Sequence, residues 1–149
     1  MTVHGIASIE DFDALKPFFR IVEQGLRDHA DGDHFFDLLA DDTVFEYVVS
    51  VPGYPRRVEG RHAVAELYRS YGRFMRLRSS DDLDVHWDPA KSVVVLEYRV
   101  HGEAVHTGRA YDNQFVSVIT IENRKVVRWR DYLDPVAIFN ASGWPTASA

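Results

Sequence analysis

The chain has 149 residues, no cysteine, and a net charge of −6 at pH 7 with histidine counted as neutral. This length suits a single domain, which we expect to span residues 1–149 with an ordered core at about 9–140. Without cysteine, disulfides, thiol nucleophiles and thiolate metal ligands are excluded. The acidic balance argues against nucleic-acid binding, which requires a basic surface. No membrane-spanning pattern or signal peptide is evident, so a cytoplasmic protein is expected.

The first half of the chain is patterned mainly for helices. A Ser8–Asp11 pair resembles a capping box, and Pro17 suits the first turn of a following helix. Apolar residues then recur at helical spacing, and the same spacing returns after Gly60. Between these regions, β-branched and aromatic residues predict strands. The expected helices span about 17–30, 34–40 and 61–75, and the expected strands span 43–51 and 57–60.

Everything after Ser80 is patterned for strands. Apolar and polar residues alternate, and the segments Asp88–Lys91 and Asn123–Arg124 carry turn signals. Helices followed by long antiparallel strands indicate an α+β fold. A strongly twisted sheet curls, so helices that close one side leave a concave pocket. The expected strands span 83–87, 92–103, 111–122 and 125–133.

Asp131 is the most informative residue of the last predicted strand. Strand alternation places Trp129, Asp131 and Leu133 on one face, among apolar neighbours. A buried carboxylate is costly without a partner, so this acid either has one or has a chemical role. A structural ion pair between Asp131 and Arg99 is one alternative, and a reacting acid in a pocket is the other.

A second polar set lies on the strand expected at 92–103. Glu97, Arg99 and His101 alternate with an unbroken apolar face, and spacing alone favours a solvent-facing position for all three. The need of Asp131 for a partner favours a pocket in which His101 and Arg99 meet it. A histidine–carboxylate pair suits proton transfer, and an arginine stabilises an oxyanion. We therefore take Asp131, His101 and Arg99 as catalytic candidates.

The remaining candidates are aromatic. Tyr47 is either a hydroxyl donor in the pocket, and so a fourth catalytic candidate, or an ordinary strand aromatic. Trp129, Phe115, Tyr71 and Phe18 are expected to line a substrate pocket or the core, which sequence alone does not separate.

Motifs for metals and nucleotides are not evident. The seven histidines are scattered, without HxxxH or EF-hand spacing, so no metal site is expected. No GxGxxG, GxxxxGK or GxSxG element occurs, so neither a phosphate-binding loop for a nucleotide nor a nucleophile elbow is indicated.

Three segments resemble a known superfamily: LLADDTVFEY, VEGRHAVAELY and TGRAYDNQFVSVITIENRKVVRWRDYLDP. They are similar to parts of the cone-shaped α+β fold of nuclear transport factor 2, ketosteroid isomerase, limonene epoxide hydrolase and the SnoaL-like polyketide cyclases. The resemblance covers roughly residues 33–139. It implies a curved antiparallel sheet of the nuclear transport factor 2-like (cystatin-like) kind, with N-terminal helices closing a pocket.

The resemblance also implies residue roles. Asp131 matches the final-strand carboxylate of limonene epoxide hydrolase, and Arg99 matches the arginine that bridges its two carboxylates. Tyr47 falls near the water-holding tyrosine of that enzyme and near the catalytic aspartate of ketosteroid isomerase. His101 stands where the hydrolase has its other carboxylate, which changes the charge of the site by about one unit.

These matches imply a cofactor-independent acid–base enzyme of isomerase, cyclase or hydrolase type, forming a homodimer. The expected ligand is a small, largely apolar molecule that resembles a polyketide, steroid or terpenoid. Two alternatives share the fold: a non-catalytic protein that binds a small ligand, and a dimeric module that binds a protein partner.

Overall fold

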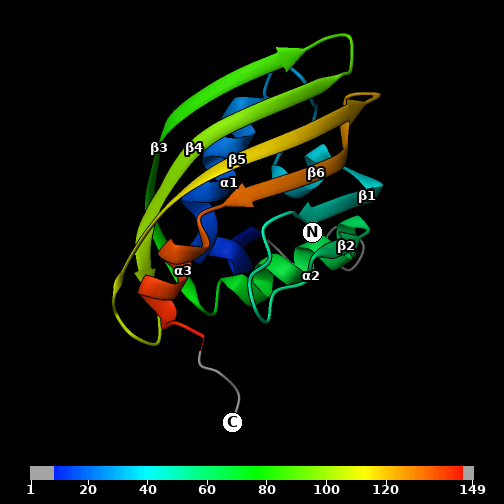
Figure 1. Cartoon of the computed structure of the whole chain (residues 1–149). Coiled ribbons are helices and arrows are strands. Elements are labelled where there is room, and N and C mark those ends of the chain that lie inside the picture. Colours follow the sequence, from blue (N-terminus) through cyan, green and yellow to red (C-terminus); the bar gives the residue numbers. More distant parts are fainter. Residues whose placement is uncertain (1–8, 146–149) are drawn as a thin grey trace.

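The computed structural model describes residues 9–145 and shows six strands in one curved sheet (Figure 1). The strand order is β2-β1-β6-β5-β4-β3. The helical elements are η1 (Ile9–Leu15), α1 (Lys16–Leu26), η2 (Phe35–Leu38), α2 (Arg61–Tyr71) and α3 (Pro135–Ser142). The strands are β1 (Leu39–Tyr47), β2 (Arg57–Glu59), β3 (Met75–Asp88), β4 (Val93–Ala104), β5 (Ala110–Glu122) and β6 (Lys125–Leu133).

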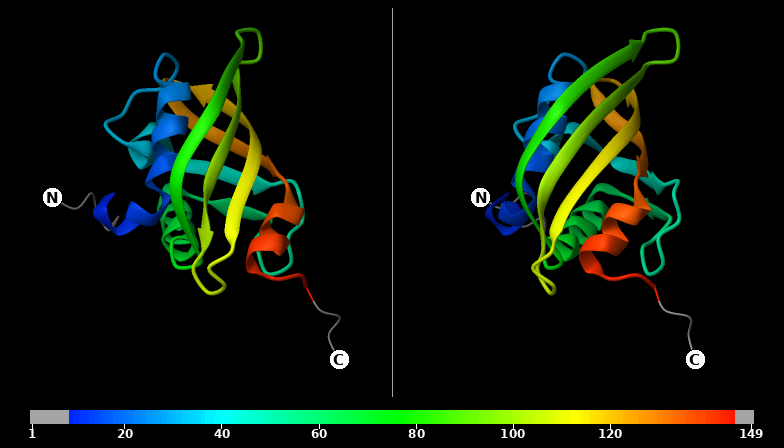
Figure 2. Two further views of the ribbon diagram at one scale, coloured as in Figure 1. Left: turned by 90° about the vertical axis from the view of Figure 1, so that its left-hand side faces the viewer. Right: turned by 60° about the vertical axis from the view of Figure 1, so that its left-hand side comes forward.

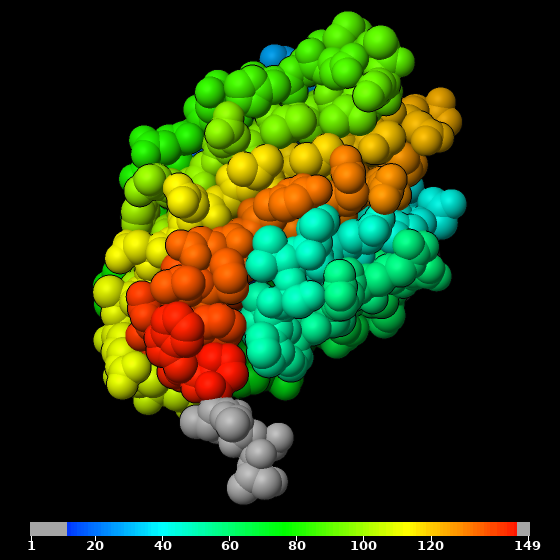
Figure 3. All heavy atoms as spheres, in the orientation of Figure 1, coloured from blue at the N-terminus to red at the C-terminus, as the bar shows by residue number. Residues whose placement is uncertain are grey.

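Helices α1 and α2 lie on the concave side of the sheet, where α1 packs on β3 and β4 and α2 packs on β1 (Figure 2). In the view of Figure 3, strands β4, β5, β6 and β1 form most of the visible surface, and α3 lies at the lower end of it. The predicted α+β layout, with N-terminal helices against a curled sheet, is confirmed. None of the helices within residues 9–145 combines the length and hydropathy needed to cross a membrane.

A curved antiparallel sheet was predicted. The observed sheet is mostly antiparallel but contains one parallel pair of strands. Strands β3 to β6 form an antiparallel meander, and β2 pairs antiparallel with β1. Strand β1 pairs parallel with β6. The chain leaves β1, crosses through α2 to the far edge, and returns strand by strand until β6 reaches β1. This closing pair places Tyr47 beside Asp131.

The helix expected at 61–75 ends at Tyr71. Backbone hydrogen bonds from Arg73 to Ser70 and from Phe74 to Tyr71 reverse the chain directly after α2. Met75 then begins β3 and is buried. The apolar spacing continues through Phe74 and Met75, but Phe74 belongs to the turn and Met75 to strand β3.

Strand β3 starts eight residues before the predicted strand at 83–87, at Met75. Charged residues occur along its length, Arg76, Arg78 and Asp84 among them, and they mask the apolar alternation. Charged side chains are typical of an edge strand, because they discourage pairing with another chain. The edge position in the strand order therefore explains the composition.

Helix α3 was not predicted. Asp134 caps it, since its Oδ1 accepts a hydrogen bond from the backbone N–H of Val136 at 3.0 Å, and Pro135 occupies the first turn. Ile138 and Ala141 are buried on its inner face. The helix therefore closes one end of the concave space.

A cluster of aromatic side chains fills the space between the helices and the β1–β6 end of the sheet. Phe35 is fully buried and packs edge-on against Trp129, with ring centroids 5.6 Å apart. Trp129 stacks on Phe45 at 5.1 Å. Each such ring stabilises the fold by roughly 1.5–3 kcal/mol through burial. The cluster makes a rigid floor beneath the pocket.

Candidate functional site

A pocket of about 80 Å³ lies on the concave side, between the sheet and helices α1, α2 and α3. Its walls are aliphatic and aromatic, with Leu15, Val100 and Ile138 among them. Asp131 is the one carboxylate among the described lining residues. The pocket therefore presents a single strong acid–base group in apolar surroundings.

Two donors hold the carboxylate of Asp131 in place. Ser117 Oγ, directly opposite on β5, donates a hydrogen bond to Oδ1 at 2.6 Å. The indole Nε1 of Trp129 donates a second bond to the same oxygen at 2.6 Å. Tyr98 in turn lies with its hydroxyl 2.8 Å from Ser117 Oγ, and it donates there because the serine proton points to Asp131.

Both bonds reach Oδ1, so Oδ2 is left for a ligand. Within residues 9–145, no hydrogen bond to Oδ2 of Asp131 is formed, and the residue contributes to the pocket wall. A carboxylate oriented through one oxygen and open at the other is suited to take up or deliver a proton.

The environment of Asp131 raises its pKa. The residue is 3% exposed, and burial raises its pKa to about 6, while the hydrogen bonds from Ser117 and Trp129 act in the opposite direction. A general acid or base works best when its pKa lies near the operating pH. The pKa of Asp131 is therefore closer to neutral pH than that of an exposed aspartate.

Three tyrosine hydroxyls in the pocket are buried. Tyr47, Tyr68 and Tyr71 all line the cavity, and among the described residues none of their hydroxyl groups makes a hydrogen bond of good geometry, although Tyr47 is close enough to Tyr68 and Tyr71 to affect their pKa values. Burial raises the pKa of each of them, so all three remain protonated donors. An unsatisfied buried hydroxyl costs roughly 1–3 kcal/mol. The cluster is therefore suited to donate hydrogen bonds to an oxygen of a bound molecule.

The structure brings most of the predicted pocket residues together. Tyr47, Tyr71, Phe115 and Phe18 line the same cavity as Asp131. Trp129 does not line this cavity and belongs to the core, the other of the two positions that its pattern allowed. It is fully buried beneath the pocket, where it packs on Phe45 and donates to Asp131.

The prediction that His101 meets Asp131 in the pocket was wrong. His101 lies on the outer face of β4, because its neighbour Val100 points into the cavity and successive strand residues alternate. Its Nδ1 is 2.7 Å from Asp112 Oδ1 and its Nε2 is 3.1 Å from Asp81 Oδ1. His101 thus binds two surface acids and is remote from the pocket.

Arg99 also lies outside the pocket, against the prediction. It is exposed on the outer face of β4, 3.7 Å from Asp82 and 3.4 Å from Gln114. The solvent-facing position that spacing alone favoured for Glu97, Arg99 and His101 is confirmed. Neither an ion pair of Arg99 with Asp131 nor a His–Arg–Asp set is formed.

Sequence reasoning missed Ser117, Tyr98 and Tyr68. Ser117 is a small polar residue between Val116 and Val118, and its position opposite Asp131 follows only from the hairpin register. Tyr98 lies on the apolar face of β4, which marks it as inward-facing. Tyr68 lies in the apolar stripe of α2 and gave no separate signal.

The sequence model of the SnoaL-like domain matches residues 17–129. The chain belongs to the SnoaL-like family. Among curated relatives, the uncharacterised protein YesE of Bacillus subtilis (strain 168) is 29% identical over 107 residues, covering 72% of this chain and 73% of YesE. The matched region includes the floor of the pocket and ends two residues before Asp131.

Solved structures show the same fold in other SnoaL-like and nuclear transport factor 2-like proteins. A Bacillus subtilis protein provisionally named an isomerase superposes with a TM-score of 0.71 at 24% identity, covering 92% of this chain and 96% of that one. An NTF2-like protein of Burkholderia xenovorans LB400 gives 0.64 at 19% identity, covering 93% and 99%. At these identities, the likeness establishes the architecture of this SnoaL-like chain.

Proposed function

We propose that this SnoaL-like protein is a cofactor-independent acid–base enzyme, an isomerase or cyclase, in which Asp131 moves a proton on a small, largely apolar carbonyl compound. The observation that carries the proposal is the carboxyl group of Asp131, which is buried in the pocket wall and held through Oδ1, with its pKa raised to about 6. Few structural roles require such an arrangement, and general-base catalysis does.

In the proposed reaction, Oδ2 of Asp131 takes a proton from the carbon next to a carbonyl group. The electron pair of the broken C–H bond moves to the carbonyl oxygen, which becomes an enolate oxygen. Hydrogen bonds from Tyr47, Tyr68 and Tyr71 stabilise that oxygen. If the substrate has a double bond one carbon further along, Asp131 returns the proton to the far carbon of the resulting dienolate. In a cyclisation, the enolate carbon instead attacks a second carbonyl of the same molecule, and the alkoxide that forms takes the proton back from Asp131.

The apolar walls favour this chemistry further. Water-poor surroundings strengthen the interaction of a hydroxyl donor with a developing negative charge. The pocket supplies no second carboxylate or imidazole within the described lining. Hydrolysis of the epoxide-hydrolase kind is therefore less well supported than isomerisation or cyclisation. The substrate class is a compact polyketide-, steroid- or terpenoid-like molecule with one oxygen function near the tyrosines.

A second function, non-catalytic binding of a small ligand, is favoured by one observation. Three buried tyrosine donors and a largely apolar wall suffice to bind a molecule with one acceptor oxygen without any reaction. In that case Asp131 anchors the ligand through a hydrogen bond. The two functions differ in whether the protein transfers a proton to or from the bound molecule.

The test is hydrogen–deuterium exchange on a bound ligand. Small carbonyl compounds are screened by thermal shift, and each hit is incubated with the protein in deuterium oxide while NMR follows its C–H signals. We expect the parent to exchange the proton next to the carbonyl and Asp131→Asn to bind without exchange. Binding without exchange by the parent would support the second function instead.

We also propose that the protein forms a homodimer through the outer face of the sheet. Val93, Val95, Val116 and Val118 are apolar and only half-buried on strands β4 and β5. Burying such a face against a second copy would remove apolar surface from water. Sedimentation equilibrium tests this: a dimer is expected, and a monomer at all concentrations would contradict it.

A further inference from the structure

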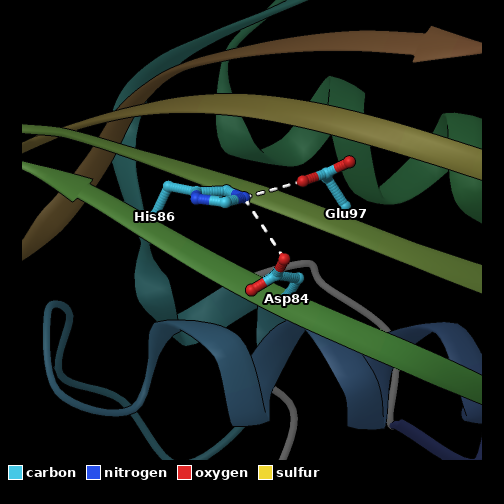
Figure 4. A group of neighbouring side chains, drawn as sticks. All are labelled: Asp84, His86 and Glu97. Atoms are coloured by element: carbon cyan, nitrogen blue, oxygen red, sulfur yellow. Dashed lines mark hydrogen bonds and ion pairs between the residues drawn. The ribbon is translucent and has the colours of Figure 1, made fainter.

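A group of three potential metal ligands lies on the outer face of the sheet, away from the pocket (Figure 4). Asp84 and His86 are alternate residues of β3 and so project from the same face. Glu97 lies directly opposite Asp84 on β4. All three side chains are exposed and come from two paired strands, so the backbone fixes their spacing.

The two carboxylates approach the same atom of the imidazole. His86 Nε2 is 2.7 Å from Glu97 Oε2 and 3.6 Å from Asp84 Oδ2. One ligand atom from each residue lies within 4.8 Å of the other two. In a tetrahedral zinc site with bonds of about 2.0–2.2 Å, ligand atoms lie roughly 3.4 Å apart. The two distances from His86 Nε2, 2.7 Å to Glu97 and 3.6 Å to Asp84, lie on either side of that spacing.

Within residues 9–145, Asp84 and Glu97 have no lysine or arginine partner, but the hydrogen bond to Glu97 raises the pKa of His86, so a metal ion would have to displace the proton of that imidazole. Among the described residues, no lysine or arginine nitrogen comes within 4.0 Å of either carboxylate, and the nearby Arg99 pairs with Asp82. Like charges directly opposite each other on paired strands repel. A cation bound between Asp84, Glu97 and His86 would remove this repulsion.

We propose that Asp84, His86 and Glu97 form a binding site for one divalent cation of the zinc class, with water in the remaining coordination position. The ligand set of one imidazole and two carboxylates suits Zn²⁺, Co²⁺ or Ni²⁺ better than Mg²⁺ or Ca²⁺, which prefer oxygen ligands alone. The sequence did not predict the site, because Glu97 is distant in sequence from Asp84 and His86 and comes next to them only through the pairing of β3 with β4.

A similar group nearby has a different geometry and supplies a matched control. His101 also contacts two carboxylates, but Asp112 lies at Nδ1 and Asp81 lies at Nε2. These nitrogens point to different sides of the ring, so the two acids cannot share one ion with it. Composition alone would give both groups the same affinity, whereas geometry assigns the metal to His86.

A bound cation would cross-link edge strand β3 to β4. Any ligand that binds only the folded state stabilises it in proportion to the logarithm of its free concentration. The melting temperature should therefore rise with added zinc. This effect is independent of the pocket and of Asp131, because the site lies on the opposite face of the sheet.

The experiment titrates ZnCl₂ into the full-length, tag-free protein by calorimetry, with CoCl₂ absorption spectra as a second probe of the coordinated ion. One site per chain is expected, with His86→Gln and Glu97→Gln each weakening binding by at least ~10-fold. His101→Gln should bind as the parent does. Circular dichroism and melting of each metal-free variant confirm that it folds.

Three outcomes would overturn the proposal: no heat or cobalt spectrum with the parent, unchanged binding by His86→Gln, or equal losses in His86→Gln and His101→Gln. The third would show diffuse attraction of cations to an acidic face. Parent-like zinc binding by Asp131→Asn is expected in every case in which the site is real.

Discussion

Trp129 and Asp131 lie two residues apart on the same face of β6, and the indole Nε1 of Trp129 donates a 2.6 Å hydrogen bond to Asp131 Oδ1. The spacing of two that makes both residues inward-facing also makes the bond possible. Trp129 is fully buried and stacked on Phe45, so its donor is fixed in space. The last strand therefore supplies both the buried carboxyl group of the pocket and one of the groups that orient it.

The raised pKa of Asp131 predicts how stability depends on pH. Its pKa is about 6 in the folded protein and near 3.8 in the unfolded chain, so the folded state holds the proton more tightly between these values. The free energy of unfolding should therefore fall as pH rises from about 4 to about 6, by up to ~3 kcal/mol from this group.

Asp131→Asn isolates that contribution. The variant should lack this part of the pH dependence, while every other titrating group contributes equally to both proteins. Urea unfolding of parent and variant across this range gives the difference. A difference that stays constant with pH would contradict a raised pKa at Asp131.

Ser117→Ala should raise the pKa of Asp131 further. The change removes a hydrogen bond to the ionised carboxylate, and such bonds contribute roughly 1.5–3 kcal/mol, or about one pKa unit or more. Carbon-13 NMR of the carboxyl group measures the shift. The control is Ser80→Ala, which loses a bond from its hydroxyl to the Pro17 carbonyl and should leave the pKa of Asp131 unchanged.

Two tyrosine variants should have opposite effects on stability. Tyr68→Phe removes a buried hydroxyl that makes no hydrogen bond of good geometry among the described residues, so stability should be unchanged or higher by up to about 1 kcal/mol. Tyr98→Phe removes the hydroxyl that bonds Ser117 and should lower stability by about 1 kcal/mol.

The same two substitutions should affect ligand binding in the opposite order to their effect on stability. Tyr68→Phe should weaken the binding of any pocket ligand with an acceptor oxygen, whereas Tyr98→Phe should change it less. Denaturant melts and ligand titrations on the two variants test this pair. A strong loss of stability in Tyr68→Phe would show that its hydroxyl already has a structural partner.

Gly102→Ala should disrupt the β3–β4 pair. A Cβ at Gly102 would overlap the carbonyl oxygen of Arg76 and lie 2.7 Å from the Cα of Leu77, and backbone atoms cannot move aside. We expect a loss of about 3 kcal/mol or more.

Gly25→Ala is the comparison for that variant. There the new Cβ meets the end of the Leu96 side chain at 2.7 Å, which can rotate away, and alanine favours the helix. Its stability should stay within about 1.5 kcal/mol of the parent. Thermal melts of both variants provide the measurement, and equal losses would contradict the expected difference.

Much of the fold was predictable because its signals are local. Alternation in β4, β5 and β6 and the apolar stripe of α2 fix those elements to within a few residues. The parallel pairing of β1 with β6 was not predictable, because it depends on the path of the whole chain. Strand β3 was only partly predicted, since an edge strand carries charges that mask its period.

The site was predictable where the signal lay within one strand. Asp131 lies between Trp129 and Leu133, and strand alternation alone predicted that its side chain faces the interior. Its partners come from register across strands, which no local pattern reveals, so Ser117 was missed. For His101, alternation in β4 indicates the polar outer face, which is where it lies, and the charge of Asp131 is instead stabilised by uncharged donors.

The most direct measurement of the central claim is an NMR titration of the Asp131 carboxyl carbon in the ligand-free parent, assigned by its absence in Asp131→Asn. Because the carboxyl group is buried in an apolar pocket, its midpoint should lie at about pH 6. A midpoint near 3.8, the value of an exposed aspartate, would show that Asp131 is an ordinary ionised group and not the proton-transfer residue of the pocket.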